Sequence, residues 1–142
     1  MSPVTAYGDG PLRVALVGTG MISVYHLRAW RNAGVPVVAV CDIDRHKATA
    51  RAAEFGIERV YDDPDLMFAE GGFEIVDNAA SLQAHAPVTR LAADCGVHVM
   101  LQKPMTETVA EAEALIDNVG ERVRFMVHEN YRFRPHYMTV RR

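Results

Sequence analysis

The sequence predicts an α/β fold in which a parallel β-sheet is covered by helices on both faces. Short, mostly β-branched runs alternate along the chain with longer segments that carry helix start and stop signals. The runs are apolar at successive positions, which is typical of parallel strands buried on both faces. Alternation at this spacing indicates a doubly wound sheet.

The predicted strands are short and evenly distributed. Five of them are "RVALV" (13–17), "VVAVC" (37–41), "IVDNA" (75–79), "HVML" (98–101) and "VRFMV" (123–127), and a weaker sixth is "RVY" (59–61). We expect them to form one sheet in the order 3-2-1-4-5-6.

The helices between these strands have recognisable ends. Asp44 and Asp63 are candidate N-caps, and a proline follows Asp63 at the first helical position. Thr108 and Glu111 have the spacing of a capping box. The expected C-terminal stops are Gly56, Gly96 and Gly120.

Length and charge restrict the class of protein. The 142 residues suit one ordinary domain. A net charge of -3 argues against a nucleic-acid partner. Four arginines near the C-terminus fit a solvated tail or the start of a connection better than an RNA-binding arm: Arg132, Arg134, Arg141 and Arg142.

Compartment and membrane association can also be judged from the sequence. Cys41 and Cys95 form no C-x-x-C pair, which favours a reduced, cytoplasmic protein. Residues 1–11 lack the pattern of a signal peptide, and we expect them to be flexible. The longest apolar run, residues 35–40, is too short to span a membrane. No membrane partner is expected.

A glycine turn follows the first predicted strand. "VALVGTGMIS" places Gly18, Gly20 and Ser23 where a dinucleotide-binding turn has two glycines and a third small residue. The first permits a tight turn, the second lets the backbone approach a pyrophosphate, and the helix N-terminus supplies N–H groups. The alternative is a purely structural turn. The strand before it and the helix after it favour the dinucleotide site.

An acid at the end of the second strand supports this interpretation. Asp42 follows Gly20 by 22 residues, the position from which a carboxylate accepts hydrogen bonds from an adenosine ribose. A carboxylate there repels a 2′-phosphate, so NAD is expected, while nearby Arg45 leaves NADP open.

With these features located, the chain resembles the glucose–fructose oxidoreductase / inositol dehydrogenase / rhizopine-catabolism (Gfo/Idh/MocA) family from about Leu12 to Tyr137. The motifs that carry the resemblance are "VGTGMISVYH", "EIVDNAASLQAHAPVTRLAADCGVHVMLQKPMTETVAEAEALID" and "NYRFRPHY". The first contains His26 at the family's histidine position, and the second contains His85 and Lys103-Pro104.

Two departures from the family pattern stand out. Ala80-Ser81 occupies the place of Thr-Pro, and Gln102 replaces the glutamate before Lys103. Loss of that acid removes a negative charge beside the lysine, so Lys103 should be held less strongly in its charged form.

The resemblance implies roles for particular residues. Lys103, at a strand end, is the expected catalytic residue and lies near nicotinamide and substrate, and Tyr131 and Arg132 are the other expected substrate contacts. Asn78 should lie at the end of the fourth strand, and His26 fits a structural role better than a cofactor contact. The expected cofactor-binding residues are Gly18, Thr19, Gly20, Met21, Ile22, Asp42, Ile43, Ala79, Ala80, Ser81, His85, Gln102 and Lys103.

The resemblance also implies a domain organisation. Residues 12–128 would form an NAD(P)-binding Rossmann domain, and residues 129–142 would begin a connection to a second α/β domain that this chain does not contain. The expected function is the nucleotide-binding part of a dehydrogenase acting on a sugar or cyclitol hydroxyl, incomplete as a catalyst by itself and able to form a homo-oligomer. The alternative is a stand-alone dinucleotide-binding module without catalysis. Histidine spacing suggests no metal site.

Overall fold

The computed structural model describes residues 12–135 and 139, and the side chains of residues 132 and 133 are outside that description. The segment 1–11, expected to be flexible, lies outside the described residues. The same holds for Arg141 and Arg142.

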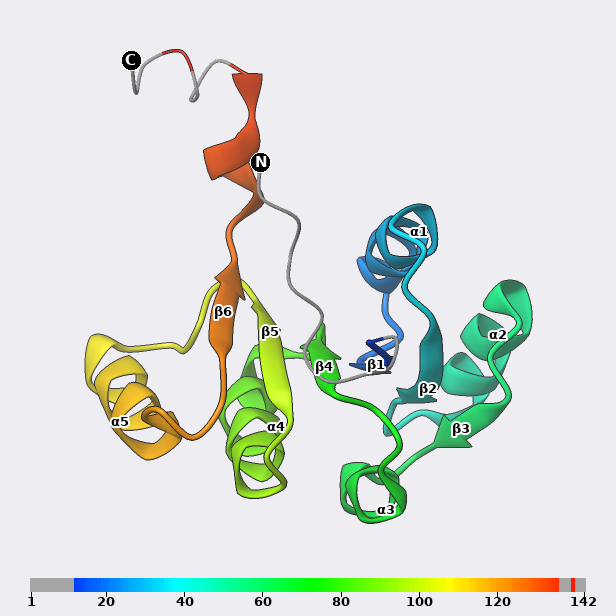
Figure 1. Cartoon of the computed structure of the whole chain (residues 1–142), viewed down its shortest axis with the longest axis horizontal. Coiled ribbons are helices and arrows are strands. Elements are labelled where there is room, and N and C mark those ends of the chain that lie inside the picture. The colour runs from blue at the N-terminus through cyan, green and yellow to red at the C-terminus, as the bar shows by residue number, and fades with distance from the viewer. Residues whose placement is uncertain (1–11, 136–138, 140–142) are drawn as a thin grey trace.

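Six parallel strands form one sheet in the order β3-β2-β1-β4-β5-β6 (Figure 1). The predicted order 3-2-1-4-5-6 is therefore confirmed. The strands are β1 (Val14–Val17), β2 (Val37–Cys41), β3 (Arg59–Tyr61), β4 (Ile75–Asn78), β5 (His98–Gln102) and β6 (Phe125–His128).

The helices begin and end close to the predicted signals. Asp44 and Asp63 cap their helices by accepting backbone N–H groups, and Thr108 and Glu111 form the capping box in both directions. The helices are α1 (Ser23–Asn32), α2 (Arg45–Phe55), α3 (Pro64–Glu70), α4 (Leu82–Asp94) and α5 (Val109–Val119), followed by the short 3₁₀ helix η1 (Asn130–Phe133).

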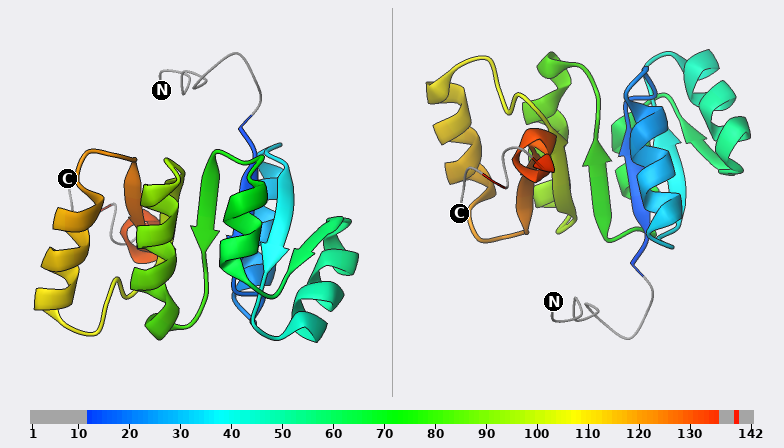
Figure 2. Two further views of the ribbon diagram at one scale, coloured as in Figure 1. Left: turned by 90° about the horizontal axis from the view of Figure 1, so that it is seen from below. Right: turned by 90° about the horizontal axis from the view of Figure 1, so that it is seen from above.

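Two hydrophobic cores lie on opposite faces of the sheet. Helices α3, α4 and α5 cover one face along its length, whereas α1 and α2 cover the β1–β3 part of the other face (Figures 1 and 2). Leu101, Leu115 and Met67 belong to the first core, and Leu16 and Leu27 to the second. Above β5 and β6 no α-helix among the described residues packs on the second face, and only the short η1 lies above it (Figures 1 and 2). Met126 there is 50% exposed.

The carboxyl ends of the central strands meet at one edge because all the strands are parallel. Val17 pairs with Asn78, and Asn78 pairs with Leu101, so β1, β4 and β5 end side by side. The glycine turn, the β4–α4 loop and Lys103 follow directly from these ends. This edge is where doubly wound sheets bind their ligands. No helix among the described residues is both long enough and apolar enough to cross a membrane.

Candidate functional site

A cleft of about 350 Å³ lies at this edge of the sheet, between the glycine turn and the β4–α4 loop. It contains more than half of the predicted cofactor-binding residues, drawn from three separate strand ends. These are Gly18, Gly20, Asp42, Ile43, Ala79, Ala80 and Ser81.

Gly18 is required at its position for two reasons. Its φ is +91°, a conformation that residues with a side chain rarely adopt. A Cβ atom there would also lie 2.4 Å from the Cα atom of Ala80. The first turn and the β4–α4 loop therefore approach so closely that only glycine fits. Gly18 therefore has a structural role in this packing and also lines the cleft.

Gly20 has a different environment. A Cβ atom built on it would have no neighbour within 4 Å, so its backbone faces open space. The backbone N–H groups of Gly20, Met21 and Ile22 donate no hydrogen bond within the described residues, and Met21 is 85% exposed. Free N–H groups before a helix form a site suited to an anion. The turn beside the cleft thus has free donors for a pyrophosphate, and Gly20 itself lines the cleft.

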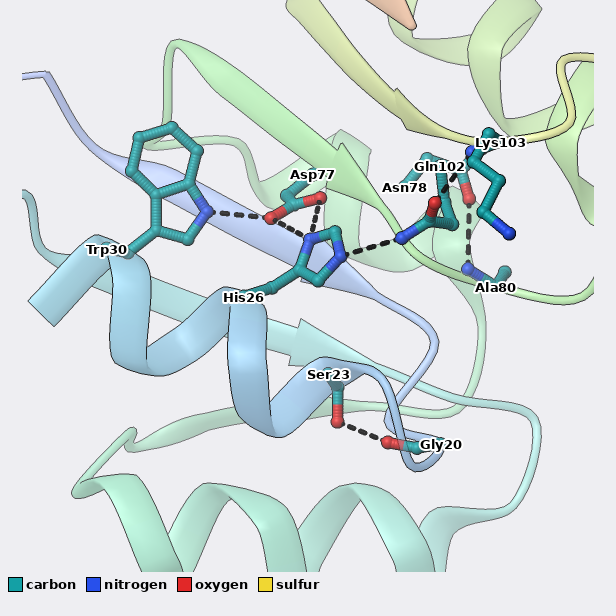
Figure 3. Close-up of polar contacts among 9 residues, drawn as sticks. All are labelled: Gly20, Ser23, His26, Trp30, Asp77, Asn78, Ala80, Gln102 and Lys103. Atoms are coloured by element: carbon teal, nitrogen blue, oxygen red, sulfur yellow. Dashed lines mark hydrogen bonds and ion pairs between the residues drawn. The ribbon is translucent and has the colours of Figure 1, made fainter. Parts of the chain in front are cut away.

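Ser23 replaces the third glycine without opening the turn. Its side chain is fully buried, and its hydroxyl donates a 2.6 Å hydrogen bond to the carbonyl of Gly20 (Figure 3). The prediction that a small side chain packs here is confirmed. The hydroxyl also fixes the turn, a function that the spacing of the motif did not show.

Asp42 is already bonded within the protein. Its Oδ2 atom accepts the backbone N–H of Thr19 at 2.7 Å and the Thr19 hydroxyl at 2.9 Å. Its Oδ1 atom accepts the backbone N–H of Asp44 at 2.9 Å. A carboxylate has about four acceptor sites, so it can also accept a ribose hydroxyl. Thr19, predicted as a cofactor contact, directs its side chain to Asp42 and is 3% exposed.

The residues around Asp42 differ sharply in exposure. Ile43 is 92% exposed beside the cleft, where it offers an apolar surface to a ligand. Cys41 is buried, and burial, reinforced by the charge of Asp42, raises the pKa of its thiol to about 12. Arg45, the residue that left NADP open, pairs with Asp62 at 3.2 Å.

His85 connects the two loops at the far side of the cleft. It is 2% exposed, with Nδ1 2.8 Å from the carbonyl of Pro104 and Nε2 3.2 Å from the carbonyl of Ala80. Asn78, also buried, donates to the carbonyl of His85 at 3.1 Å. His85 therefore holds the β4–α4 loop against the segment after Lys103, and neither ring nitrogen is directed into open space.

Lys103 lies exposed directly after β5, and the Lys103–Pro104 peptide bond is cis. Gln102, before it, turns its side chain away from the cleft and toward His26 on α1 (Figure 3). Tyr131, a predicted substrate contact, is 45% exposed on η1. The side chain of Arg132 lies outside the described part of the structure.

Sequence reasoning missed Asp77 and Trp30. Asp77 is completely buried in β4 and accepts hydrogen bonds from His26 and Trp30. Both ring nitrogens of His26 have partners within the protein, Asp77 on β4 and Gln102 on β5. An acid inside the apolar run "IVDN" was the available signal, because a buried carboxylate requires partners. The described residues contain no group of three or more metal-ligating side chains that could hold a metal ion.

The fold and the cleft define a dinucleotide-binding Rossmann domain. The model of the "Oxidoreductase family, NAD-binding Rossmann fold" (Gfo/Idh/MocA) matches residues 12–130. The chain belongs to this family.

Three relatives illustrate the relationship. D-apiose dehydrogenase from Paraburkholderia graminis is 39% identical over 90% of this chain and 35% of its own length. Inositol 2-dehydrogenase 1 from Saccharopolyspora erythraea is 32% identical over 92% of this chain and 40% of its own length. The crystal structure of an oxidoreductase from Agrobacterium radiobacter with NAD⁺, L-tartaric acid and magnesium has a TM-score of 0.84 and 35% identity. The match covers 87% of this chain and 36% of the chain from Agrobacterium radiobacter. The chain thus spans well under half the length of each.

Proposed function

We propose that this chain is the NAD-binding part of a dehydrogenase that oxidises a hydroxyl group of a sugar or cyclitol. The observation that carries the proposal is the meeting of Gly20, Asp42 and Lys103 at one edge of the sheet. Relatives named for D-apiose and inositol support a polyhydroxylated substrate. Two free cysteines support a reducing compartment, which we take to be the cytoplasm.

The pyrophosphate and the adenosine ribose have candidate partners at this edge of the sheet. The N–H groups of Gly20, Met21 and Ile22 would hold the pyrophosphate, and Asp42 would accept from the ribose hydroxyls. Arg45 is paired with Asp62, so its positive charge is less available to attract the 2′-phosphate of NADP. This pairing supports NAD over NADP.

Lys103 is the proposed catalytic residue. When bound, NAD supplies the hydride acceptor. The ammonium group of Lys103 can donate a hydrogen bond to the substrate hydroxyl oxygen and stabilise the negative charge that develops there as the hydroxyl proton passes to solvent water. Tyr131 and Arg132 follow β6 on the same side of the sheet and are the proposed further substrate contacts.

Calorimetric titration with NAD and NADP tests the cofactor. We expect NAD to bind more tightly than NADP. We expect Gly20→Ala to keep its stability, because the added methyl group enters open space in the protein. The same methyl group should weaken NAD binding, because it separates the backbone from the pyrophosphate. Tighter binding of NADP, or unchanged NAD binding by Gly20→Ala, would contradict the proposal.

The substrate class is tested through the lysines. The chain contains two, Lys103 and the exposed Lys47 on α2, so ¹³C-methylation gives two lysine signals to compare, apart from that of the α-amino group. Adding myo-inositol or apiose to the NAD-saturated chain should shift the Lys103 signal and leave that of Lys47 in place. No shift at Lys103 with any polyol would count against its role in binding substrate.

A further inference from the structure

A chain of side-chain hydrogen bonds runs from α1 across β4 and β5 to the backbone of Lys103 (Figure 3). Trp30 Nε1 donates to Asp77 at 2.7 Å, and both oxygens of Asp77 lie 2.9 Å from Nδ1 of His26. The other ring nitrogen of His26 lies 2.9 Å from Nε2 of Gln102. Oε1 of Gln102 then accepts the backbone N–H of Lys103 at 2.8 Å. We name this set of five residues the relay.

The two ends of the relay fix the position of every proton between them. The indole N–H of Trp30 and the backbone N–H of Lys103 can only donate. Gln102 must therefore present its oxygen to Lys103 and its NH₂ group to His26. Nε2 of His26 must then accept, so the ring carries its single proton on Nδ1 and donates it to an ionised Asp77. The network is fully satisfied only when His26 is neutral.

The relay is shielded from solvent at its centre. Asp77 is 0% exposed and His26 is 4% exposed, so a misplaced proton cannot be compensated by water. The His128 ring meets the His26 ring edge to face, with centroids 5.0 Å apart. Among the described residues, Asp77 from β4 bonds to the His26 ring, His128 from β6 packs against it, and Tyr25 from the same helix lines the same cavity. Glu129 acts electrostatically on His128, and Lys103 follows Gln102 with an exposed side chain.

We propose that Asp77, His26 and Gln102 are positioning residues for Lys103, and that they hold its backbone only while His26 is neutral. A second proton on His26 makes Nε2 a donor, which requires Gln102 to turn its oxygen toward the ring. Its NH₂ group then faces the N–H of Lys103, and that hydrogen bond is lost. The catalytic meaning of this device rests on the proposed function of Lys103, whereas the proton arrangement does not.

The proton arrangement can be measured by long-range ¹H–¹⁵N correlation of the histidine rings at pH 7.5. We expect His26, assigned by its loss in His26→Gln, to show a protonated Nδ1 and an unprotonated Nε2. In Gln102→Glu the carboxylate faces Nε2, so His26 should take up a second proton from solvent. Gln83→Glu is the matched control, since Gln83 lies on α4 away from His26, and it should leave the ring unchanged.

The hold on Lys103 is measured by hydrogen exchange of its backbone amide. In Gln102→Met, which has a similar shape but no acceptor, we expect exchange to speed up by at least tenfold. In the unmodified chain, protection should be lost at the pH where His26 gains its second proton, and Gln102→Glu should keep it. A purely structural role for Gln102 would not couple these two readouts.

The outcomes separate this inference from the proposed function. A proton on Nε2 of His26 in the unmodified chain overturns the relay, even if NAD binds. The relay is also overturned if exchange of the Lys103 amide changes neither in Gln102→Met nor on protonation of His26. A chain that shows the expected protons and protection but does not bind NAD keeps the relay and loses the proposed function.

Discussion

The carboxylate of Asp42 accepts the backbone N–H of Thr19 at 2.7 Å, so the acid after β2 also fixes the glycine turn after β1. Two elements that a dinucleotide site needs are thereby joined before any ligand arrives. A change at Asp42 will act on the turn as well as on the cofactor, and an informative variant must separate these effects.

Asp42→Asn is expected to weaken NAD binding by about 1.5–3 kcal/mol, the range for hydrogen bonds to a charged group. Asparagine keeps the size and one acceptor but loses the charge, so NADP binding should fall less because repulsion of its 2′-phosphate is relieved. Calorimetry with both nucleotides measures the difference. Thr19→Val is the control for the turn: it removes the 2.9 Å hydroxyl bond to Asp42 and should cost roughly 0.5–1.5 kcal/mol of stability. Equal losses for NAD and NADP in Asp42→Asn would contradict the expectation.

Gly18→Ala should destabilise the fold by roughly 2–4 kcal/mol, because the new methyl group meets both a positive φ and the backbone of Ala80 at 2.4 Å. Gly34→Ala is the matched control. Gly34 also has a positive φ, +71°, but has no neighbour within 4 Å of a Cβ atom, so it should cost only about 1–2 kcal/mol. Urea unfolding measures both. Equal costs would show that the close approach to Ala80 is unimportant.

The fold was predictable because its signals are local. Strand runs, N-caps such as Asp44 and the capping box at Thr108 each lie within a few residues, and parallel alternation leaves few topologies. The glycine turn and Asp42 were predictable for a related reason. They lie within a single strand–helix–strand unit, whose length sets the number of residues between them.

The relay was not predictable because its members are far apart in the sequence. His26 and Asp77 are 51 residues apart, and His26 and Gln102 are 76 apart. Which face of β4 carries Asp77, and which helix covers that face, follow only from the assembled sheet. His85 was predicted as a cofactor contact, and its two carbonyl partners similarly depend on the packing of two loops.

Cys95 is expected to react with iodoacetamide at neutral pH, whereas Cys41 is not. Cys95 is exposed, while Cys41 is buried at the end of β2 with its pKa raised to about 12, chiefly by burial. Little thiolate therefore forms at Cys41, and the reagent has no access to it. Mass spectrometry should find one adduct on the native chain, none on Cys95→Ser, and two after denaturation. Rapid labelling of Cys41 in the native Cys95→Ser variant would contradict this.

Stability should fall as the pH drops below about 6.5, in part because of His128. Burial is the main cause that lowers the pKa of His128 in the folded chain. The unfolded chain therefore takes up this proton first, so unfolding becomes more favourable as the pH falls from the unfolded pKa to the lower folded one. Urea unfolding is measured at pH 7.5 and at pH values between 6.5 and 5. The free energy of unfolding should fall less over this range for His128→Gln than for the unmodified chain. His46→Gln, at an exposed position on α2, is the control and should behave like the unmodified chain.

His85→Ala is expected to destabilise the fold by roughly 2–4 kcal/mol, since it leaves a cavity and removes the contacts to the carbonyl groups of Pro104 and Ala80. Because Ala80 lines the cleft and Pro104 follows Lys103, NAD binding should weaken too, even where the chain remains folded. Urea unfolding gives the first effect, and calorimetry at low temperature, where the folded fraction is high, gives the second. His46→Ala, which removes an exposed ring, should change stability by about 0.5 kcal/mol or less. If His85→Ala is as stable as His46→Ala and binds NAD normally, the two loops are held by other contacts.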